Sequence, residues 1–519
     1  MALGTLSPQA RFEGPAELLG GRLKGIYRFL ADHGDVLFPT GYFSDLYSAS
    51  RLGQPTVPAR VVATVMLLQS HEGLSDAEAA DRLGRDLAWQ AAAGVQSGYE
   101  PFHPTLLVGV RNRLRASARP KRLFEDTKAA ARGAGVMKDR ARVLDSTPVY
   151  DAVATQDTVT QLRAALRKLL RLLEGTDLEN KVRAALSRDD DYRSPGKPPC
   201  DWDDPVARDE LVDALVKDAK AAFSELEGER LTSAVAGAAE LLALVAGQDV
   251  EQREDGSFTI AKKVAKDRVI STVDPEARHG HKSHDRHFDG FKCHVSVDPD
   301  SELVDEVTVT PGNVADRGPV DELLCPVAEM ADKPVIFADS AYADGETLDR
   351  LEGQGFKVMA KVPPAVNRDG RFTKDDFSID LGASTVTCPA GQTAGIRFGD
   401  DGAGQAGFGK ACAACPLAER CTTNKAGRTV TVHRHEEVLQ EHKADQASPE
   451  WQGAYKRTRP KVERKIGHMV RKPWGGRKAR ARGAARVVTD VVARAAAVNF
   501  ARLAVLGVHW DGAAWAAGP

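Results

Sequence analysis

Long apolar runs are missing from this 519-residue sequence. No stretch of about 18 apolar residues occurs, which excludes an ordinary membrane-spanning helix. The first residues lack a basic segment followed by an apolar one, so we expect no export signal. Seven cysteines are too few and too unevenly spaced for a disulfide framework, and they indicate metal binding in a reducing compartment. We therefore expect a soluble cytoplasmic protein with no membrane partner.

An excess of charge of either sign is also absent. The formal net charge is −2, so the whole-chain balance gives no information about a polyanionic partner, and only the local distribution of charge can. Hydrophobic residues make up 42% and charged residues 28%, which is ordinary for a globular chain and argues against wholesale disorder. The length predicts two to four domains.

Residues 15–130 are predicted to be mostly helical. The apolar run at 57–68 is long enough for a buried helix, with Pro58 suited to its first turn. A second helix is predicted to start after Ser75, because Ser75 is a good N-cap and Glu78 occupies the capping-box position. Short helices of this kind fit a helix-turn-helix module, and they fit any small helical bundle equally well.

The middle of the chain changes from helical to strand-like patterning. Residues 142–149 predict a buried strand ending at an acidic residue, and 158–250 return to helical periodicity around a polar linker at 189–204. The expected elements after that are a hairpin of strands 288–297 and 303–309 with its turn at 298–300, a helix at about 315–330, a strand at 335–338, a helix at about 344–353 and a strand at 356–360. This order is similar to the ribonuclease-H-like arrangement of nucleases and integrases, a mixed-sheet α/β fold.

Two aspartates follow strand-like segments in this region, Asp145 and Asp339. Taken singly, an aspartate at a strand end is usually a turn or cap residue. Phosphodiester cleavage, however, needs a nucleophilic oxygen, a stabilised leaving oxygen and relief of phosphate charge, which two divalent cations about 4 Å apart supply. Mg²⁺ prefers hard oxygen ligands and needs few carboxylates. Such a site requires a third carboxylate from a helix that faces the same sheet.

The densest basic region of the chain contains one candidate for that carboxylate. Residues 456–486 hold 13 lysines and arginines and a single acidic residue, Glu463. The surrounding cations favour the anionic form of Glu463 and are suited to holding DNA phosphates near metal ions. The alternative is that Glu463 forms an intrahelical ion pair with Lys461 or Lys465.

The chain resembles the transposases of the insertion-sequence 1182 group, within the insertion-sequence 4-like DDE transposases. Each matching fragment is weak singly, but their order and combination are hard to produce by chance. The fragments are Gly73–Ala79, Leu106–Leu114, Val143–Thr147, Ser271–Arg278, Gly290–His294, Val309–Asp316, Ala338–Tyr342 and Arg459–Arg464. The resemblance implies that Asp145, Asp339 and Glu463 are the catalytic triad, holding two Mg²⁺ (or Mn²⁺) ions. The first two lie 194 residues apart, an interval that the helical insertion at about 155–265 explains.

A second family motif is only partly present. It consists of Tyr, two residues, Arg, three residues, Glu, six residues and Lys. Arg459 and Glu463 keep their interval, whereas Tyr455 is one residue too far upstream and Val470 occupies the lysine position, with Arg471 next. By this resemblance Arg459 is a catalytic residue. The residues expected to bind nucleic acid are Arg457, Arg459, Lys461, Arg464, Lys465, Arg471, Lys472, Arg477 and Lys478.

Four of the seven cysteines cluster in residues 388–421. Cys412 and Cys415 form a CxxC pair, with Cys421 after them and Cys388 before them. Zinc binds four thiolates tetrahedrally, and a CxxC turn supplies two of them, so we expect a structural Zn²⁺ in a zinc-ribbon-like insertion. The alternatives are free thiols or a redox pair, although the usual strand-to-helix redox context is missing.

Two further features have bland alternatives. Residues 278–287 are rich in histidine and cations and predict a basic loop facing DNA phosphate; an inert solvated loop is nearly as compatible, and the spacing suits no common metal site. Trp474, among cationic residues, is placed either to stack on a base or to pack in the core.

These features predict a helical DNA-binding or assembly domain at 1–135, a ribonuclease-H-like catalytic domain at 136–380, a Cys-rich insertion at 381–450 and a basic helical part at 451–519 that completes the catalytic domain. The expected function is metal-dependent cleavage and strand transfer at the ends of an insertion sequence, with an endonuclease step. The expected partners are terminal inverted repeats, target DNA and at least one more copy of the chain, at the nucleoid of a prokaryotic cell. The alternatives are a catalytically inactive DNA-binding regulator derived from a transposase and a stand-alone nuclease.

Overall fold

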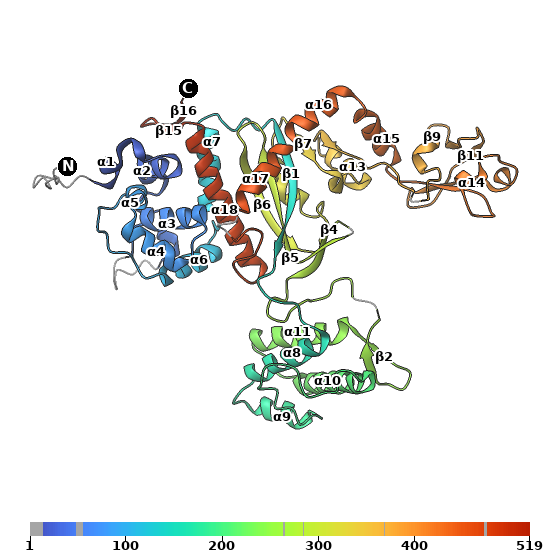
Figure 1. Cartoon of the computed structure of the whole chain (residues 1–519), viewed down its shortest axis with the longest axis horizontal. Helices are drawn as coiled ribbons and strands as arrows, with labels where there is room; N and C mark the ends of the chain where they lie inside the picture. Colours follow the sequence, from blue (N-terminus) through green and yellow to red (C-terminus); the bar gives the residue numbers. More distant parts are fainter. Residues whose placement is uncertain are drawn as a thin grey trace, which may run out of the picture.

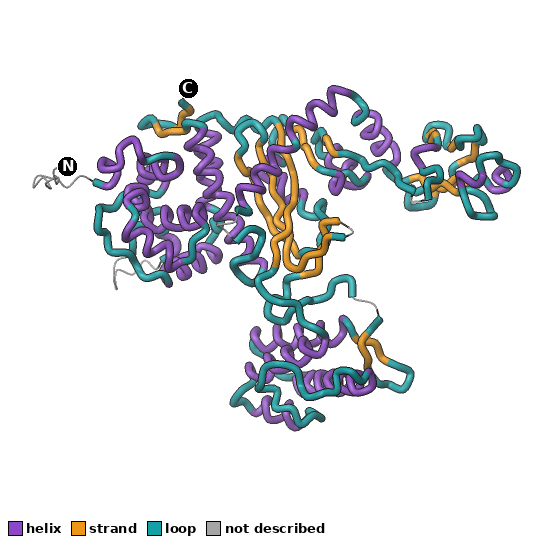
Figure 2. Tube along the Cα trace, in the orientation of Figure 1, coloured by secondary structure: helices purple, strands orange, loops and turns teal. Residues whose placement is uncertain are grey.

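The computed structural model describes residues 14–47, 56–262, 265–283, 285–367, 369–471 and 475–518. Lys472 and Trp474, which the sequence singles out, lie outside these residues. A central sheet has three extensions: the N-terminal helices on one side, a helical insertion below it and a Cys-rich segment on the far side (Figure 1). Figure 2 shows that the strands gather in the central sheet and in the Cys-rich segment, while helices dominate elsewhere.

The central sheet is mixed, as expected. Its strands are β1 (Ala141–Tyr150), β4 (Arg278–Ser283), β5 (Arg286–Asp298), β6 (Leu303–Pro311), β7 (Val335–Ala338) and β8 (Val358–Ala360). The order is β4-β5-β1-β7-β8, with β6 also paired to β5. β1 is antiparallel to β5 and parallel to β7, and β7 is parallel to β8. The predicted hairpin of β5 and β6 is confirmed, with Val295 opposite Val307.

Three sequence predictions need correction in this region. The strand that contains Asp145 does not end there, because β1 stays paired with β5 as far as Tyr150. The segment 278–287 is no loop: β4 and the start of β5 form an antiparallel hairpin. The helix expected at about 315–330 shrinks to α12 (Val320–Leu324) and a following 3-10 turn (Cys325–Val327). Prolines at 319 and 326 bound α12, and proline interrupts the backbone hydrogen bonds of a helix interior.

The N-terminal helices follow local sequence signals closely. They are α1 (Pro15–Leu19), α2 (Gly25–Leu37), α3 (Ala59–Glu72), α4 (Asp76–Arg85), α5 (Leu87–Ala93), α6 (Thr105–Ala116) and α7 (Arg122–Gly133). The capping box is confirmed: the amide of Glu78 donates to Ser75 Oγ at 3.2 Å, and the amide of Ser75 donates to the Glu78 carboxylate at 2.7 Å. Pro58 is the N-cap of α3 rather than a residue of its first turn, and Gly73 ends α3 in the left-handed region at φ 74°.

A single hydrophobic core joins these helices to one face of the central sheet. The long helix α18 (Ala484–Val505) runs between the two, and its side chains Ala495, Phe500 and Leu503 are fully buried in the shared core. Asn499 of α18 adds buried polar contacts: its amide donates to Thr127 Oγ1 of α7 at 3.0 Å and to the carbonyl of Val304 in β6 at 2.8 Å. The N-terminal helices are therefore packed against the sheet through a third element.

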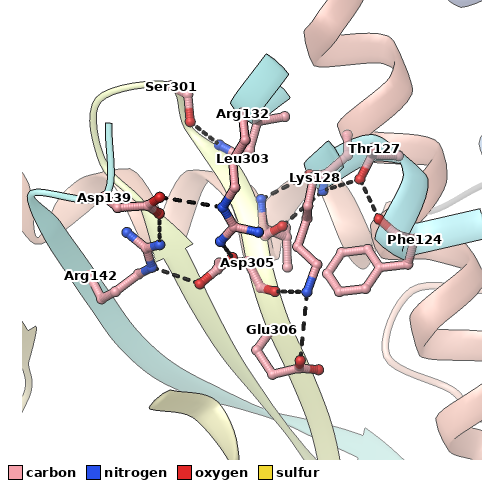
Figure 3. Close-up of polar contacts among 12 residues, drawn as sticks. Phe124, Thr127, Lys128, Arg132, Asp139, Arg142, Ser301, Leu303, Asp305 and Glu306 are labelled. Atoms are coloured by element: carbon pink, nitrogen blue, oxygen red, sulfur yellow. Dashed lines mark hydrogen bonds and ion pairs between the residues drawn. The ribbon is translucent and has the colours of Figure 1, made fainter. Parts of the chain in front are cut away.

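Buried charges fix the same junction (Figure 3). Asp305 of β6 has no exposed side-chain surface and accepts from Arg142 Nε of β1 at 2.8 Å and from Arg132 Nη2 of α7 at 3.1 Å. Lys128 of α7 donates to the main-chain carbonyl of Asp305 at 2.9 Å. Asp139 pairs with Arg142 as well. Every charge in this network has an opposite charge beside it, which burial of ionic groups requires.

The helical insertion leaves the sheet after β1 and returns at β4. It consists of α8 (Thr158–Leu172), α9 (Asp177–Ala185), α10 (Pro205–Leu226), α11 (Ser233–Gln248), β2 (Val250–Gln252) and β3 (Phe258–Ile260). Its leucines and valines, such as Leu166, Leu215 and Leu242, form a core of their own, separate from that of the sheet. The insertion is thus a unit with its own core, connected to the sheet through β1 and β4.

The opposite face of the sheet is covered by α12 and α13 (Gly345–Gly353), with Leu144, Ile336 and Leu348 buried between. After β8 the chain runs out through the Cys-rich segment and comes back along three helices. Its elements are β9 (Ser378–Asp380), β10 (Thr385–Thr387), β11 (Thr393–Gly395), β12 (Arg397–Phe398), β13 (Gly404–Gly407), α14 (Ala418–Cys421), β14 (Thr429–Val432), α15 (Glu436–Asp445), α16 (Pro449–Thr458) and α17 (Pro460–Met469). The chain closes with the hairpin β15 (Val508–Trp510) and β16 (Trp515–Ala517). None of the described helices has the length and apolar composition needed to cross a membrane.

Candidate active site

Acidic side chains from two adjacent strands meet a helix over the centre of the sheet. Asp145 lies in mid-strand on β1, on the same side as Val143, whose side chain belongs to the core shared with α17 and α18. Asp339 directly follows β7, and its Oδ1 accepts from the amide of Ala341 at 3.0 Å, which fixes the turn after the strand. Glu463 comes from the first turn of α17. Three segments far apart in sequence are therefore brought together.

Arg459 joins the three carboxylates. Its Nη2 lies 3.0 Å from Asp145 Oδ2 and 3.9 Å from Asp339 Oδ2, and its Nη1 lies 3.7 Å from Glu463 Oε1. The Arg459 side chain is only 10% exposed, whereas those of Asp339 and Glu463 are 39% and 65% exposed. The guanidinium thus approaches the acids from the protein side, and two of the carboxylates face solvent.

Burial, together with neighbouring charges, shifts the pKa values in this cluster. Burial raises the pKa of Asp145, and the nearby Asp339 raises it further, while Arg459 lowers it only in part. The pKa of Asp339 is also raised, first by burial and then by another carboxylate, Asp316. Burial would lower the pKa of Arg459, but Asp145 and Asp339 outweigh that effect and raise it. One guanidinium does not neutralise this many acids, so the site favours further cations.

Tyr455 reaches the same site in spite of its displacement from the family spacing. It lies on α16 four residues before Arg459, and Glu463 lies four residues after Arg459, so the three share one helical face across the α16–α17 junction. The Tyr455 hydroxyl donates to the carbonyl of Ala338, the last residue of β7, at 3.0 Å. Trp451 stacks on the Tyr455 ring with centroids 4.8 Å apart. A tyrosine one helical turn upstream of Arg459 therefore links α16 to the end of β7.

Three further polar residues, which the sequence did not indicate as site residues, lie beside the acid cluster. Lys292 of β5 pairs with Asp316 at 2.9 Å and also donates to the carbonyl of Val314. Tyr342 is buried, its hydroxyl has no hydrogen-bond partner among the described residues, and its pKa is raised by burial and by Asp316. All three residues lie within the fragments that carry the family resemblance. Their presence in those fragments was the sequence signal that could have identified them.

The basic residues expected to bind nucleic acid do not form one surface. Lys461 donates to the carbonyl of Pro299, Arg464 pairs with Glu302 at 2.5 Å, and Lys465 is 3% exposed and pairs with the same Glu302. These contacts attach α17 to the turn between β5 and β6. Arg457 and Lys478 are exposed.

The two remaining arginines of this set lie nearer the strands and the N-terminal helices. Arg477 Nε donates to Thr147 Oγ1 at 2.8 Å, two residues beyond Asp145 on β1. Arg471 lies close enough to His71, on α3, to help lower its pKa, after the larger effect of burial. This position does not place Arg471 in the acid cluster, where a substitute for the family lysine would be expected.

The four clustered cysteines converge in the Cys-rich segment. Cys388, Cys412, Cys415 and Cys421 line one small pocket together with aromatic side chains such as Phe377 and Phe408. The pKa of the Cys421 thiol is raised by burial and by the three neighbouring thiols, against the effect of Arg428. None of the cysteines in the described residues forms a disulfide. Within the same residues, no group of three or more His, Cys, Asp or Glu side chains is arranged to hold a metal ion.

Comparison with protein families finds three matches along the chain. Residues 23–113 match a transposase domain (DUF772), and residues 258–376 and 387–504 match two transposase DDE domains. The first DDE match contains Asp339 and the second contains Glu463. Comparison with curated proteins and with solved structures gave no match. The DDE matches imply a ribonuclease-H-like fold for the mixed sheet. Three transposase matches in this order indicate that the chain is a DDE transposase similar to those of the insertion-sequence 4 and 1182 groups.

Proposed function

We propose that this transposase cuts DNA at the ends of its insertion sequence and joins those ends to target DNA, with Asp145, Asp339 and Glu463 as its catalytic carboxylates. The observation that carries the proposal is the contact of one buried guanidinium, that of Arg459, with all three acids. An intrahelical pair of Glu463 with Lys461 or Lys465 is not favoured, because both lysines contact the β5–β6 turn.

The donor set fits Mg²⁺ or Mn²⁺, two ions per site. Carboxylate oxygens are the hard ligands these ions prefer, and Asp339 and Glu463 keep a good part of their surface open to solvent. Asp145, Asp339 and Glu463 share the guanidinium of Arg459, which leaves negative charge for added cations to neutralise. When bound, such ions supply an activated nucleophile and relief of phosphate charge.

The chain's own residues then orient the reacting groups. In the first step a water attacks the phosphorus at the element end, and the bond to the 3′ oxygen breaks to leave a free 3′-hydroxyl. In the second step that hydroxyl attacks a target phosphodiester, so one phosphate ester bond forms as another breaks. Arg459 holds Asp145 and Asp339 in position from the protein side and offsets part of their negative charge.

Different segments of the chain are proposed to recognise, cut and hold the DNA. We propose that residues 1–135 recognise the terminal inverted repeats and assemble the complex, and that 136–380 and 451–519 carry out catalysis. Among the basic residues, Arg457, Arg477 and Lys478 are proposed to contact phosphates, and Arg471 and Lys472 are assigned to the same set from the sequence. Two element ends must be held at once, so the active assembly is a dimer or larger, acting at the nucleoid in the cytoplasm.

We propose that the Cys-rich segment, 381–450, folds as a zinc-ribbon-like insertion with a structural Zn²⁺. Support comes from the four thiols that line one pocket, three of which help to raise the pKa of the fourth, Cys421. Thiolate ligands are what a structural zinc site requires, and zinc binding would deprotonate them. The ion's role would be to hold the loops around Cys388 and the CxxC turn together.

A strand-transfer assay with labelled element ends tests the catalytic proposal. Wild-type protein is expected to cut and join, and Asp339→Asn is expected to lose both while still binding DNA. The control is Asp332→Asn, which removes an exposed carboxylate a few residues earlier and should change nothing. Cutting without joining would support a nuclease, and binding alone by the wild type would support an inactive regulator. Equal loss of binding and cleavage in Asp339→Asn would show that Asp339 is structural.

A further inference from the structure

An open cleft of about 480 Å³ separates the N-terminal helices from the start of α18. One wall is formed by α6 with the facing ends of α3 and α4, and the other by the segment 480–493. Four arginines line it: Arg111 and Arg115 from α6, and Arg480 and Arg486 from the segment that leads into α18. Asn112, Ser70 and Thr489 add uncharged hydrogen-bonding groups.

The cleft carries an excess of positive charge that the protein does not neutralise. Its two carboxylates are already paired, Asp76 with Arg111 at 2.5 Å and Asp490 with Arg494 at 2.6 Å. In the described part of the chain, Arg115, Arg480 and Arg486 have no carboxylate within ion-pairing distance. Arg115 donates to Asn112 and Arg480 to the carbonyl of Leu74. Arg480 and Arg486 are exposed, and Arg115 is half-buried. Three guanidiniums are thus left for an anion.

The segment that leads into one wall of the cleft is also paired with the active-site strand. Arg477 donates to Thr147, two residues from Asp145, and its carbonyl accepts from the amide of Tyr150 at 2.7 Å. The amide of Ala479 then donates to the carbonyl of Tyr150, and the next residue, Arg480, already reaches α3–α4 at Leu74. A polyanion in the cleft would therefore extend toward the carboxylate cluster along this segment.

We propose that this cleft, between α6 and the start of α18, binds the phosphate backbone of duplex DNA and leads it to the active site. The inference rests on the proposed function and adds a site to it. Guanidinium groups on both walls suit a ligand with repeated negative charges, since each arginine presents a fork of donors that matches phosphate. The lining is mainly arginine, amide and hydroxyl groups with two paired carboxylates, and its apolar members are Val108, Ala481 and Ala493. Backbone contacts position DNA without reading its sequence.

Binding of a labelled random-sequence duplex, followed by fluorescence anisotropy over a range of salt concentrations, tests this site. The variant is Arg115→Gln/Arg486→Gln, and its matched control is Arg85→Gln/Arg230→Gln, which removes two exposed arginines outside the cleft. The cleft variant is expected to bind about tenfold more weakly, with a salt-dependence slope lower by about 2, because each lost phosphate contact lowers that slope by about 0.9. The charge-keeping variant Arg115→Lys/Arg486→Lys should retain most of the affinity.

The inference is overturned if the cleft variant and the control bind the duplex equally, with the same salt slope. Thermal unfolding of both variants shows whether a loss of affinity reflects a loss of fold. If the double glutamine variant does not fold, the single variants Arg115→Gln and Arg486→Gln are measured instead, and a wild-type affinity and salt slope in both would overturn the site. If wild-type protein joins element ends while the cleft variant binds normally, only the cleft fails. If Asp339→Asn still cleaves while the cleft variant loses affinity, only the catalytic assignment fails.

Discussion

The guanidinium Nη2 of Arg459 lies 3.0 Å from Oδ2 of Asp145, and this contact ties the α16–α17 junction to the middle of β1. Because the Arg459 side chain is only 10% exposed, solvent screens the charges of this pair weakly. The same guanidinium extends toward Asp339 and Glu463. Arg459 therefore sets the distance between the helix that carries Glu463 and the strands that carry the two aspartates.

Two substitutions of Arg459 test the contributions of its charge and of its planar shape separately. Arg459→Gln is expected to lower single-turnover DNA cleavage by about 100-fold or more, because it leaves Asp145 without its cation and removes the group that positions the three carboxylates. Arg459→Lys should fall between this variant and the wild type, since it keeps the charge and loses the fork. Arg230→Gln, which alters an exposed arginine of the helical insertion, is the control. Wild-type cleavage by Arg459→Gln would contradict the role.

Local signals in the sequence were sufficient for several elements. The capping box of Ser75 and Glu78, the hairpin of β5 and β6 and the position of Asp339 after β7 each depend on residues within a few positions of one another. Features of this kind depend on neighbouring residues and not on distant contacts, so the sequence alone is enough to predict them. For the same reason, the prolines that bound α12 at 319 and 326 were a readable signal that the sequence prediction did not use.

Long-range pairing decided what the sequence alone did not reveal. Asp145 is in mid-strand because β5, far along the chain, pairs with β1 beyond it. The basic run of α17 was expected to face DNA, but Glu302 in the β5–β6 turn takes Arg464 and Lys465 as partners. The arginine cleft joins α6 to the start of α18, which no local pattern brings together. Charge density along a sequence does not indicate which cations remain unpaired.

The buried ion pair of Arg142 and Asp305 should be costly to break (Figure 3). Asp305→Asn is expected to lower the free energy of unfolding by about 3–5 kcal/mol, because two arginines then lose their shared carboxylate inside the protein. The control is Asp321→Asn, whose 63% exposed side chain pairs with Arg350 at the surface and should contribute about 0–1 kcal/mol. Urea titration followed by circular dichroism measures both, and equal midpoints for the two variants would contradict the prediction.

Metal analysis of the purified protein addresses the cysteine cluster. We expect about one Zn²⁺ per chain, lost in the variant Cys412→Ser/Cys415→Ser and retained in Cys325→Ser, which alters an exposed cysteine outside the cluster. Removal of the ion with a chelator should expose the four thiols to a thiol reagent. A protein without zinc whose four thiols titrate freely would remove the structural-zinc proposal and leave the aromatic pocket as an apolar core.

His294 should give the protein a stability that depends on pH. It is fully buried on β5, its Nε2 lies 2.8 Å from Thr310 Oγ1, and burial lowers its pKa from 6.5 to about 4, with Asp316 opposing the shift and Lys292 adding to it. The unfolded chain therefore binds a proton between pH 6.5 and 4 that the folded chain does not, so stability falls as pH drops through this window, by up to about 3 kcal/mol. In His294→Gln, which keeps an amide nitrogen near Thr310, that part of the pH dependence should vanish. In His281→Gln, an exposed histidine on β4, it should persist. Urea midpoints measured from pH 4 to 7 decide the matter, and parallel curves for the wild type and His294→Gln would show that His294 titrates normally in the folded protein.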